Sequence, residues 1–388
     1  MKLQETLTDL LDQSYDSAGE FERISESARN PVLVLGTGHL GRWSLSALQQ
    51  AGIRAPAFCD NNSRLWGTTV MGVPVMSPAE ALACYPGAAV VVAVYNASRP
   101  IQQLRTLGCD RVVPYPVLFW KHWRYMPGED RLELPARILA RAAEMAAGYD
   151  LLEDQRSRQE FCAQIRWRCC LDSALLAAPA DPREMYYPAD LFELISDERF
   201  VDCGAFDGDS IRAFLERSAG RFGHIYAWEA DERNVGALRR YLGTLEDSKA
   251  DRITVLPYAV ARENGTIRFS CQGLVSSRVE ANGREIECRS LDSALAGSDP
   301  SLIKMDIEGA EPDALLGAAK IMARFRPIMA VCAYHKCDHL WTLPQILKAG
   351  NPDYRIFLRR YAEDCWETVY YAIPPERLKL REGIDAVE

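Results

Sequence analysis

The sequence of 388 residues predicts an α/β protein, with a C-terminal doubly wound sheet and a smaller N-terminal Rossmann-like α/β domain joined by a helical linker. Two observations predict this fold. An apolar run leads into a glycine-rich turn and an amphipathic helix twice, after Val32 and after Phe200. The chain is also too long for one ordinary domain. We place the boundaries at residues 1–29 for an N-terminal helical arm, 30–116 for the Rossmann-like module, 117–197 for the linker and 198–388 for the C-terminal domain.

Composition limits the classes of protein to consider. An apolar fraction of 48% and a charged fraction of 26% are typical of a soluble globular chain. The net charge of −9 offers no basic surface for nucleic acid or an acidic membrane. The longest strongly apolar run, 88–94, is far below the ~20 residues that span a bilayer, and residues 1–17 lack the apolar region of a signal peptide. We therefore expect a cytoplasmic protein with reduced thiols that binds neither nucleic acid nor membrane.

The N-terminal module carries a dinucleotide-binding pattern. After the strand at 32–35, Gly36, Gly38 and Gly41 are spaced as Gly-x-Gly-x-x-Gly, and the next strand ends at Asp60, 19 residues past the last glycine. Such glycines form a tight turn that lets the backbone approach a phosphate, and the acid binds the ribose. Because only a half-sized Rossmann unit follows, the module either holds one nucleotide or serves as a scaffold.

The C-terminal domain opens with a similar unit. A strand ending near Asp202 is followed by a turn with Gly204 and Gly208 and then by an amphipathic helix. The next strand, 224–228, ends in Glu229, 21 residues past Gly208. A doubly wound sheet places a carboxylate here to accept both ribose hydroxyls. The alternative is a glycine turn with a solvated glutamate, and we favour the nucleoside site.

Four polar residues follow four predicted strands of this domain. Because parallel strands end at the same edge of a sheet, we expect them to lie together: Asp202, Glu229, Asp306 and His335. His335 could take a proton near neutral pH. Asp306 and Glu308 form a pair of carboxylates that could hold a divalent cation or a substrate hydroxyl.

Other residues near Asp306 have structural interpretations. Lys304 lies inside a buried strand and is predicted to pair with Asp306 or Glu308. Glu311 precedes Pro312 and is predicted to be the N-terminal cap of a helix or a partner of its dipole. A histidine pair formed by His335 and His339 lacks an indicated third metal ligand.

Three further stretches carry expectations. Residues 117–197 are predicted to be helical. Tyr186 and Tyr187 are interpreted as packing under the sheet, with pocket lining as the alternative. The polar loop 273–278 joins two strands of a predicted antiparallel ribbon and could reach the substrate.

The C-terminal motifs resemble those of the FkbM family of methyltransferases over about residues 186–372. The motifs are Val201-Asp202-Cys203-Gly204-Ala205-Phe206-Asp207-Gly208, Trp228-Glu229-Ala230-Asp231, Ile303-Lys304-Met305-Asp306-Ile307-Glu308-Gly309-Ala310-Glu311 and Tyr334-His335-Lys336. The resemblance implies a class I S-adenosylmethionine fold and methyl transfer to a hydroxyl, often on a sugar or polyketide. The implied site comprises Asp202, Gly204, Ala205, Asp207, Gly208, Glu229 and Ala230 for the cofactor, with Asp306, Glu308 and His335 for catalysis. Ala230 stands where the family usually has proline.

The N-terminal module resembles the N-terminal domain of bacterial sugar acyltransferases that hold a nucleotide-sugar. The matching stretches are 34–41, Phe58-Cys59-Asp60-Asn61 and Gly72-Val73-Pro74-Val75, within residues 31–116. The resemblance implies a nucleotide at Gly36, Gly38, Gly41 and Asp60.

We expect an S-adenosylmethionine-dependent O-methyltransferase acting on a small, sugar-like acceptor, with or without a divalent metal. One alternative is a nucleotide-sugar oxidoreductase or isomerase that uses the first glycine turn, although the chain has no Tyr-x-x-x-Lys couple for proton relay. The other is a binding protein that retains the cofactor without turnover. The sequence leaves the acceptor, the metal, the ligand of the N-terminal module and homo-oligomerisation open.

Overall fold

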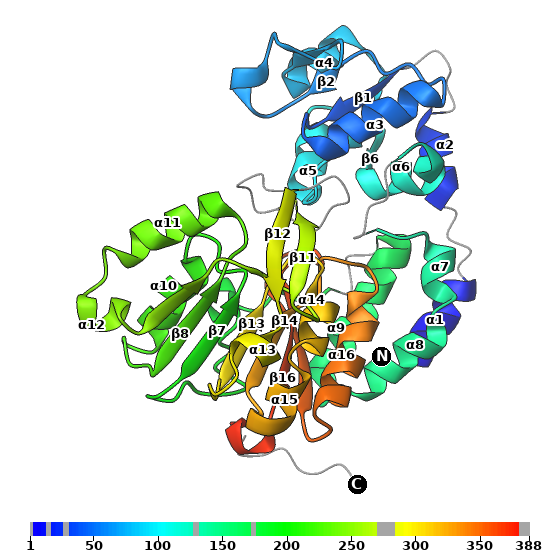
Figure 1. Ribbon diagram of the computed structural model, residues 1–388. Coiled ribbons are helices and arrows are strands. Elements are labelled where there is room, and N and C mark those ends of the chain that lie inside the picture. Colours follow the sequence, from blue (N-terminus) through cyan, green and yellow to red (C-terminus); the bar gives the residue numbers. More distant parts are fainter. Residues whose placement is uncertain are drawn as a thin grey trace. The chain divides into compact units, whose positions relative to one another are not determined.

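The computed structural model describes residues 3–12, 17–25, 31–126, 132–171, 176–269 and 284–379 (Figure 1). The chain divides into two compact units. The larger contains Met1–Leu7, Ala140–Trp167 and Asp172–Glu388, and the smaller contains Thr8–Leu139 and Arg168–Leu171. The polar loop 273–278 lies outside the described residues. Within the described ranges, no helix is both long enough and apolar enough to cross a membrane.

The smaller unit is built on a six-stranded sheet with strand order β3-β4-β2-β1-β5-β6. Its elements are α2 (Ser17–Ser25), β1 (Val32–Leu35), α3 (His39–Gln50), β2 (Phe58–Cys59), the 3₁₀ turn Ser63–Leu65, β3 (Thr69–Val70), β4 (Val73–Met76), α4 (Pro78–Cys84), β5 (Ala89–Val92), α5 (Ser98–Thr106), β6 (Val112–Pro114), α6 (Tyr115–His122), the 3₁₀ turn Trp123–Tyr125 and α7 (Pro135–Leu139). Helices α1 (Leu3–Asp12) and α9 (Gln155–Cys170) are divided between the units. All neighbours pair in parallel except β3 with β4. The buried strands β1 and β5 are continuous apolar runs, as parallel strands covered on both faces require.

The larger unit is built on a seven-stranded sheet with strand order β15-β16-β14-β13-β7-β8-β9, beside a three-stranded sheet of order β10-β12-β11. Its elements are α8 (Ala142–Asp150), α9 (Gln155–Cys170), the 3₁₀ turn Pro182–Glu184, β7 (Arg199–Cys203), α10 (Asp209–Arg217), β8 (His224–Trp228), α11 (Glu232–Leu242), α12 (Asp247–Ala250), β9 (Ile253–Leu256), β10 (Ala259–Val260), β11 (Gly265–Phe269), β12 (Arg284–Arg289), α13 (Leu291–Ala294), β13 (Leu302–Met305), α14 (Glu311–Leu316), α15 (Ala319–Phe325), β14 (Ile328–Cys332), α16 (His339–Gly350), β15 (Arg355–Arg360), β16 (Thr368–Ile373) and the 3₁₀ turn Pro375–Arg377. Only β16 runs antiparallel to its neighbours in the large sheet. The predicted α/β fold is therefore confirmed.

The order of strands places a crevice beside β7. From β7 the chain continues outward through β8 and β9, and it then returns to β13 on the other side of β7. This reversal is the topological switch point, where open α/β sheets bind ligands beyond the carboxyl ends of the strands. The register sets Asp202 of β7 opposite Lys304 of β13.

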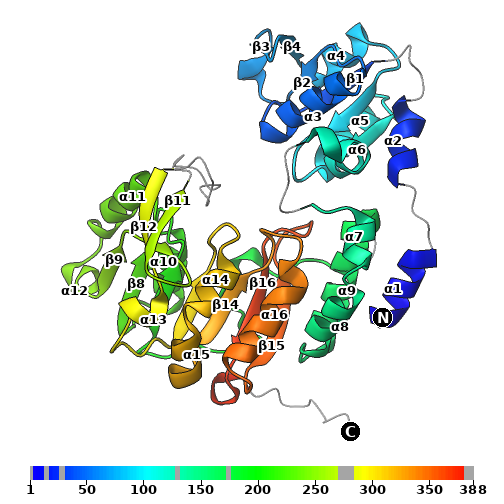
Figure 2. The same ribbon diagram turned by 45° about the vertical axis from the view of Figure 1, so that its right-hand side comes forward.

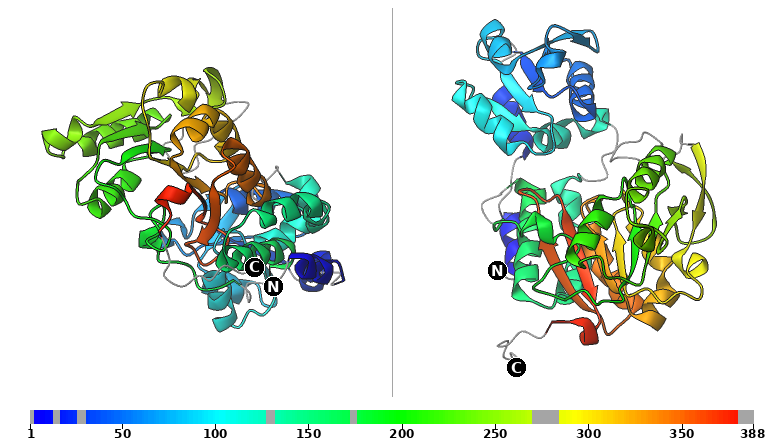
Figure 3. Two further views of the ribbon diagram at one scale, coloured as in Figure 1. Left: turned by 90° about the horizontal axis from the view of Figure 1, so that it is seen from below. Right: turned by 90° about the vertical axis from the view of Figure 1, so that its left-hand side faces the viewer.

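Helices cover both faces of the large sheet (Figure 3). On one face, Phe200, Leu302 and Ile328 belong to a core that includes Ile211 and Phe214 of α10. The alternate strand residues point to the other face, where α14, α15 and α16 lie side by side (Figures 1 and 2). The core on both faces holds the strand ends of the crevice in place.

The prediction of a helical linker is correct only in part. Helices α6, α7, α8 and α9 occupy much of the range from 117 to 170, and α9 ends at Cys170. Described residues 176–197 contain no helix beyond the 3₁₀ turn Pro182–Glu184. Pro179, Pro182 and Pro188 explain why residues 176–197 form no α-helix, since proline lacks the backbone N–H and disfavours helical geometry in the residue before it.

Lys304 and Asp202 form a buried ion pair between β13 and β7. The Lys304 Nζ atom lies 3.0 Å from Asp202 Oδ1 and donates to the Gly204 carbonyl oxygen at 2.7 Å. The side chains are only 2% and 0% exposed. Burial alone would lower the pKa of Lys304, but Asp202, Asp306 and Asp209 raise it above its ordinary value. The predicted ion pair exists, but its partner is Asp202 on the neighbouring strand.

Replacing Lys304 with methionine should strongly destabilise the larger unit. The Lys304→Met variant leaves the Asp202 carboxylate buried without a counter-charge, which typically costs about 3–5 kcal/mol in free energy of unfolding. Urea unfolding followed by circular dichroism measures this difference. The matched control is Lys320→Met, at an exposed lysine of α15. Equal stabilities of the two variants would contradict the assigned role of the pair.

Candidate functional site

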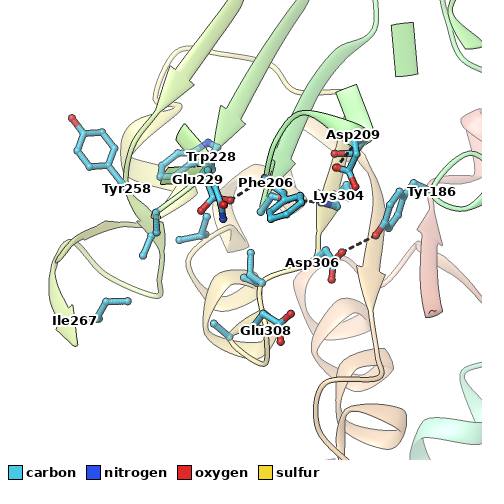
Figure 4. A pocket seen from close by; sticks show the side chains of 18 of the residues that line it. Tyr186, Phe206, Asp209, Trp228, Glu229, Tyr258, Ile267, Lys304, Asp306 and Glu308 are labelled. Atoms are coloured by element: carbon cyan, nitrogen blue, oxygen red, sulfur yellow. Dashed lines mark hydrogen bonds between the residues drawn. The ribbon is translucent and has the colours of Figure 1, made fainter. Parts of the chain in front are cut away.

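A pocket opens at the carboxyl ends of β7, β8 and β13, at the switch point of the large sheet (Figure 4). Trp228 and Glu229 stand at one end of it, and Asp306 and Tyr186 stand at the other. Ile267 of β11 and Tyr258 contribute to the wall on the same side as Trp228. The pocket thus has two chemically distinct ends.

Glu229 is held rigidly at the first end. Its Oε2 accepts from the Phe206 N–H at 2.9 Å and its Oε1 from the Asp231 N–H at 2.7 Å. Burial raises the pKa of Glu229 above its ordinary value, and the two N–H donors oppose that rise only in part. The Asn234 side chain also hydrogen-bonds this carboxylate, and the lone pairs that remain can accept from hydroxyl donors. Glu229 therefore suits the ribose-binding role that its position predicts.

The glycine turn brings β7 close to β13. Gly204 has φ +82°, and a Cβ atom built there would lie 2.0 Å from the Asp306 carbonyl oxygen. Only glycine fits this position. Phe206 adopts φ +46°, an uncommon conformation for a non-glycine residue, and its N–H is bound by Glu229. The turn is therefore fixed by the same carboxylate that lines the pocket.

The predicted cofactor residues divide into two groups. Gly204, Glu229 and Ala230 line the pocket. The remaining four lie outside its wall: Asp202, Ala205, Asp207 and Gly208. Asp202 is fully buried against Lys304 and the Ser210 hydroxyl, so it can act on the pocket only through them. Asp207 instead pairs with Arg212 at the surface.

Asp306 is held at the second end by two tyrosines. The Tyr186 hydroxyl donates to Asp306 Oδ2 and the Tyr334 hydroxyl donates to Asp306 Oδ1, each at 2.9 Å. Burial acts to raise the pKa of Asp306, but Lys304, His335 and the two hydroxyls lower it below its ordinary value. Asp306 is therefore ionised at neutral pH.

His335 lies behind Asp306, outside the pocket wall. Its side chain is 1% exposed, its Nδ1 lies 2.8 Å from Glu311 Oε1, and its Nε2 lies 3.3 Å from Asp306 Oδ1 and 3.9 Å from Glu308 Oε1. Burial acts to lower the pKa of His335, but Glu311, Asp306 and Glu308 raise it above its ordinary value. The structure therefore places the predicted proton acceptor beside the predicted carboxylate pair, but without direct access to the pocket.

The predicted metal interpretations find no support in the geometry of the described ranges. There, no group of three or more histidine, cysteine, aspartate or glutamate side chains is arranged to hold a metal ion. His339 Nδ1 faces Glu311 Oε2 at 3.4 Å. Glu311 thus contacts both histidines, and it lies in the first turn of α14 as a dipole partner, since the N-cap is Ala310.

Sequence reasoning missed several contacts of the site. Tyr186, interpreted as packing, lines the pocket and binds Asp306, and Tyr334 does the same. A hydrophobicity pattern contains no signal for a hydroxyl contact 120 residues away. Tyr186, Phe206 and Glu308 all line the pocket with φ between +46° and +70°. Such strained backbone conformations concentrate at functional sites.

In the smaller unit the four predicted residues come together at one turn. Asp60 Oδ2 accepts from the Thr37 N–H at 3.0 Å and from its hydroxyl at 2.8 Å. A Cβ atom at Gly41 would lie 1.8 Å from the Gly36 carbonyl oxygen, so close packing of the helix on the turn explains that glycine. A Cβ atom at Gly38 would meet nothing within 4 Å. Packing therefore does not explain Gly38.

The strand order, the antiparallel β16 and the carboxylate-bearing pocket at the switch point define the class I methyltransferase architecture. Residues 202–343 match the family model described as the Methyltransferase FkbM domain. The larger unit thus carries a methyltransferase domain of the FkbM type. This domain is that of an enzyme that uses S-adenosylmethionine as the methyl donor.

Solved structures extend the comparison of folds. The methyltransferase FkbM from Methylobacillus flagellatus KT aligns with a TM-score of 0.78 and 22% identity, over 95% of this chain and 99% of that one. An rRNA methylase from Streptococcus thermophilus aligns over 51% of this chain and 99% of its own, with 15% identity and a TM-score of 0.32. A putative methyltransferase from Streptococcus mutans, solved with SAH, covers 47% of this chain and 90% of its own, with 9% identity and a TM-score of 0.29. No curated protein matches the chain.

The Gly204→Ala variant should disrupt the site. The added Cβ atom meets the Asp306 carbonyl oxygen in a conformation that disfavours alanine, so we expect a loss of at least about 2 kcal/mol in free energy of unfolding. The control is Gly236→Ala in α11, where the Cβ atom meets nothing within 4 Å and alanine favours the helix. The thermal unfolding midpoints of the two variants measure this difference. Similar midpoints would contradict the close approach of Gly204 to the Asp306 carbonyl oxygen.

Proposed function

We propose that the larger unit transfers the methyl group of S-adenosylmethionine to a hydroxyl of a sugar, nucleotide-sugar or related natural-product acceptor. The observation that carries this proposal is the pairing, in one pocket, of a buried ribose-type carboxylate, Glu229, with a second carboxylate end at Asp306 and Glu308. The first end fits a nucleoside and the second fits a hydroxyl group. The matching family model supports the reaction class.

The donor end fits a nucleoside in three respects. Glu229 presents acceptor oxygens to two ribose hydroxyls, and its backbone partners fix their direction. Trp228 and Tyr258 give the wall aromatic surface beside it. Gly204 lets the backbone line the pocket without a side chain. S-adenosylmethionine would supply an electrophilic methyl group on its sulfonium.

The acceptor end fits a hydroxyl donor. Methyl transfer is an in-line displacement, so the protein accelerates it mainly by positioning the reactants. Asp306 and Glu308 both line the pocket and are the groups placed to accept a hydrogen bond from the attacking hydroxyl. The hydroxyl proton becomes strongly acidic as the oxygen gains the methyl group, so an ionised carboxylate of low pKa is a sufficient acceptor. This proposal moves the proton-accepting role from His335 to these carboxylates.

Calorimetric titration with S-adenosylhomocysteine tests the donor site. We expect wild type to bind, and Glu229→Gln to bind at least about tenfold more weakly, because a ribose hydroxyl loses a charged acceptor. Glu246→Gln, at an exposed glutamate paired with Lys249, serves as the control. Absence of binding to wild type would remove the methyltransferase proposal for this pocket.

The same titration should depend on pH. Burial raises the pKa of Glu229, so this group takes up a proton at a higher pH than an ordinary glutamate. The protonated form loses acceptor capacity, and we therefore expect affinity to fall as the pH is lowered through that raised pKa. Glu229→Gln should show a flatter profile over the same range. Parallel profiles would show that another group controls binding.

We further propose that the smaller unit binds a nucleotide or nucleotide-sugar at Gly36, Gly38, Gly41 and Asp60. The supporting observation is Gly38, where the backbone is open and packing demands no glycine. In dinucleotide folds this second glycine allows the backbone to approach a phosphate.

A Gly38→Thr variant separates binding from folding. Its Cβ atom enters open space, and threonine is about as good as glycine at the N-cap position of α3, so the thermal midpoint should remain near that of wild type while binding of a uridine diphosphate sugar or NAD(P) is lost. A flat wild-type titration with both ligand classes would leave the module a scaffold. A flat titration with NAD(P) alone would remove the oxidoreductase alternative.

A further inference from the structure

Glu311 connects two parts of the acceptor end that lie on different elements. It is fully buried at the start of α14, and its Oε1 accepts from the Ile307 N–H at 2.9 Å and from His335 Nδ1 at 2.8 Å. Ile307 lies between Asp306 and Glu308, so Glu311 holds the backbone that carries both carboxylates. It also holds the imidazole that contacts Asp306.

The held backbone is conformationally strained. Glu308 has φ +55° and Gly309 has φ +101°. A strained turn persists only where its surroundings determine it, and the buried Glu311–Ile307 hydrogen bond is such a constraint. Without the Glu311 carboxylate, the turn would lose the acceptor that fixes its first peptide N–H.

The imidazole of His335 is enclosed by acidic groups. Glu311 faces its Nδ1, Asp306 faces its Nε2 at 3.3 Å, and Glu308 lies at 3.9 Å. A neutral imidazole has one nitrogen without a proton, and either choice would direct a lone pair at a carboxylate oxygen. The imidazolium instead carries a proton on both nitrogens: Nδ1 donates to Glu311, and Nε2, which forms no hydrogen bond to a described residue, lies within ion-pair distance of Asp306. The geometry alone therefore favours the charged form.

Other charged groups near His335 come from neighbouring elements. His339 of α16 faces Glu311, and burial lowers the pKa of His339, which keeps it neutral. Lys304 of β13 acts on Asp306 from the other side, but its ammonium is paired with Asp202. Because His339 is neutral and Lys304 is paired, the carboxylates of the Glu311–His335–Asp306 array determine the charge of the His335 imidazole.

We propose that Glu311 and His335 are positioning residues: a buried carboxylate–imidazolium pair that fixes the loop carrying Asp306 and Glu308 and keeps Asp306 ionised for the attacking hydroxyl. The inference rests on the proposed methyl transfer. As the new C–O bond forms and the S–C bond breaks, the electron pair of that bond goes to sulfur and the hydroxyl proton goes to the Asp306 carboxylate. His335 takes no proton in this step, because both of its nitrogens already carry one.

Nuclear magnetic resonance of ¹⁵N-histidine-labelled protein tests the array without an acceptor. The chain has only five histidines, and His335→Asn assigns the signal of interest. We expect wild-type His335 to remain mainly an imidazolium at pH 7, where a histidine with the ordinary pKa of about 6.5 is mostly neutral. A mostly neutral His335 at that pH would overturn the proposal, whatever the variants do.

The Glu311→Gln variant tests the role of the carboxylate. Glutamine has nearly the same shape but no charge, so we expect His335 to titrate at least about one pH unit lower, while the affinity for S-adenosylhomocysteine stays within about threefold of wild type. A purely structural Glu311 would change the unfolding midpoint without moving this titration, and an unmoved titration would overturn the assignment. If Glu311→Gln does not fold, Glu311→Asp retains the charge at a greater distance and should give a smaller shift of the same sign.

The two proposals fail separately. Loss of nucleoside binding in wild type, with His335 still charged, would remove the methyltransferase assignment of the pocket and leave the charge state of the array as observed. Normal binding with a neutral His335 would remove only the positioning role.

Discussion

The buried pair between Lys304 and Asp202 joins the two strands on which the pocket depends. It bridges β7 and β13 at the point where the sheet reverses direction, and the same ammonium binds the Gly204 carbonyl oxygen. A lone buried charge in either strand would destabilise the fold, so each residue requires the other. The pair also places positive charge close to Asp306, which lowers the pKa of that pocket carboxylate.

The two ends of the pocket are held by different groups of the protein. Glu229 is fixed by backbone N–H groups at the nucleoside end, whereas Asp306 is fixed by the hydroxyls of Tyr186 and Tyr334 at the other end. Behind Asp306, His335 is held by Glu311. Glu229 and Asp306 are thus oriented by separate sets of donors, which suits a reaction accelerated by positioning.

Much of this arrangement can be predicted from sequence because it is local. The strand ending before Glu229, the turn at Gly204 and the antiparallel ribbon follow from apolar runs and turn residues. The partner of Lys304 and the burial of His335 could not be predicted, because they depend on strand register and on the packing of α14 against the end of β14. The contact of Tyr186 with Asp306 crosses 120 residues of sequence. The site roles and domain boundaries expected from sequence remain predictions.

Both units contain the same type of hydrogen bond between a carboxylate and a glycine turn, and it affects the conformational entropy lost on ligand binding. In each, the carboxylate that ends the second strand accepts an N–H from the glycine turn of the first, as Asp60 does from Thr37 and Glu229 does from Phe206. The turn is therefore ordered before any ligand arrives. A pre-ordered turn loses little conformational freedom when a ligand binds, so more of the contact energy appears as affinity. The conformational entropy of these two turns is therefore lost when the protein folds and not when a ligand binds.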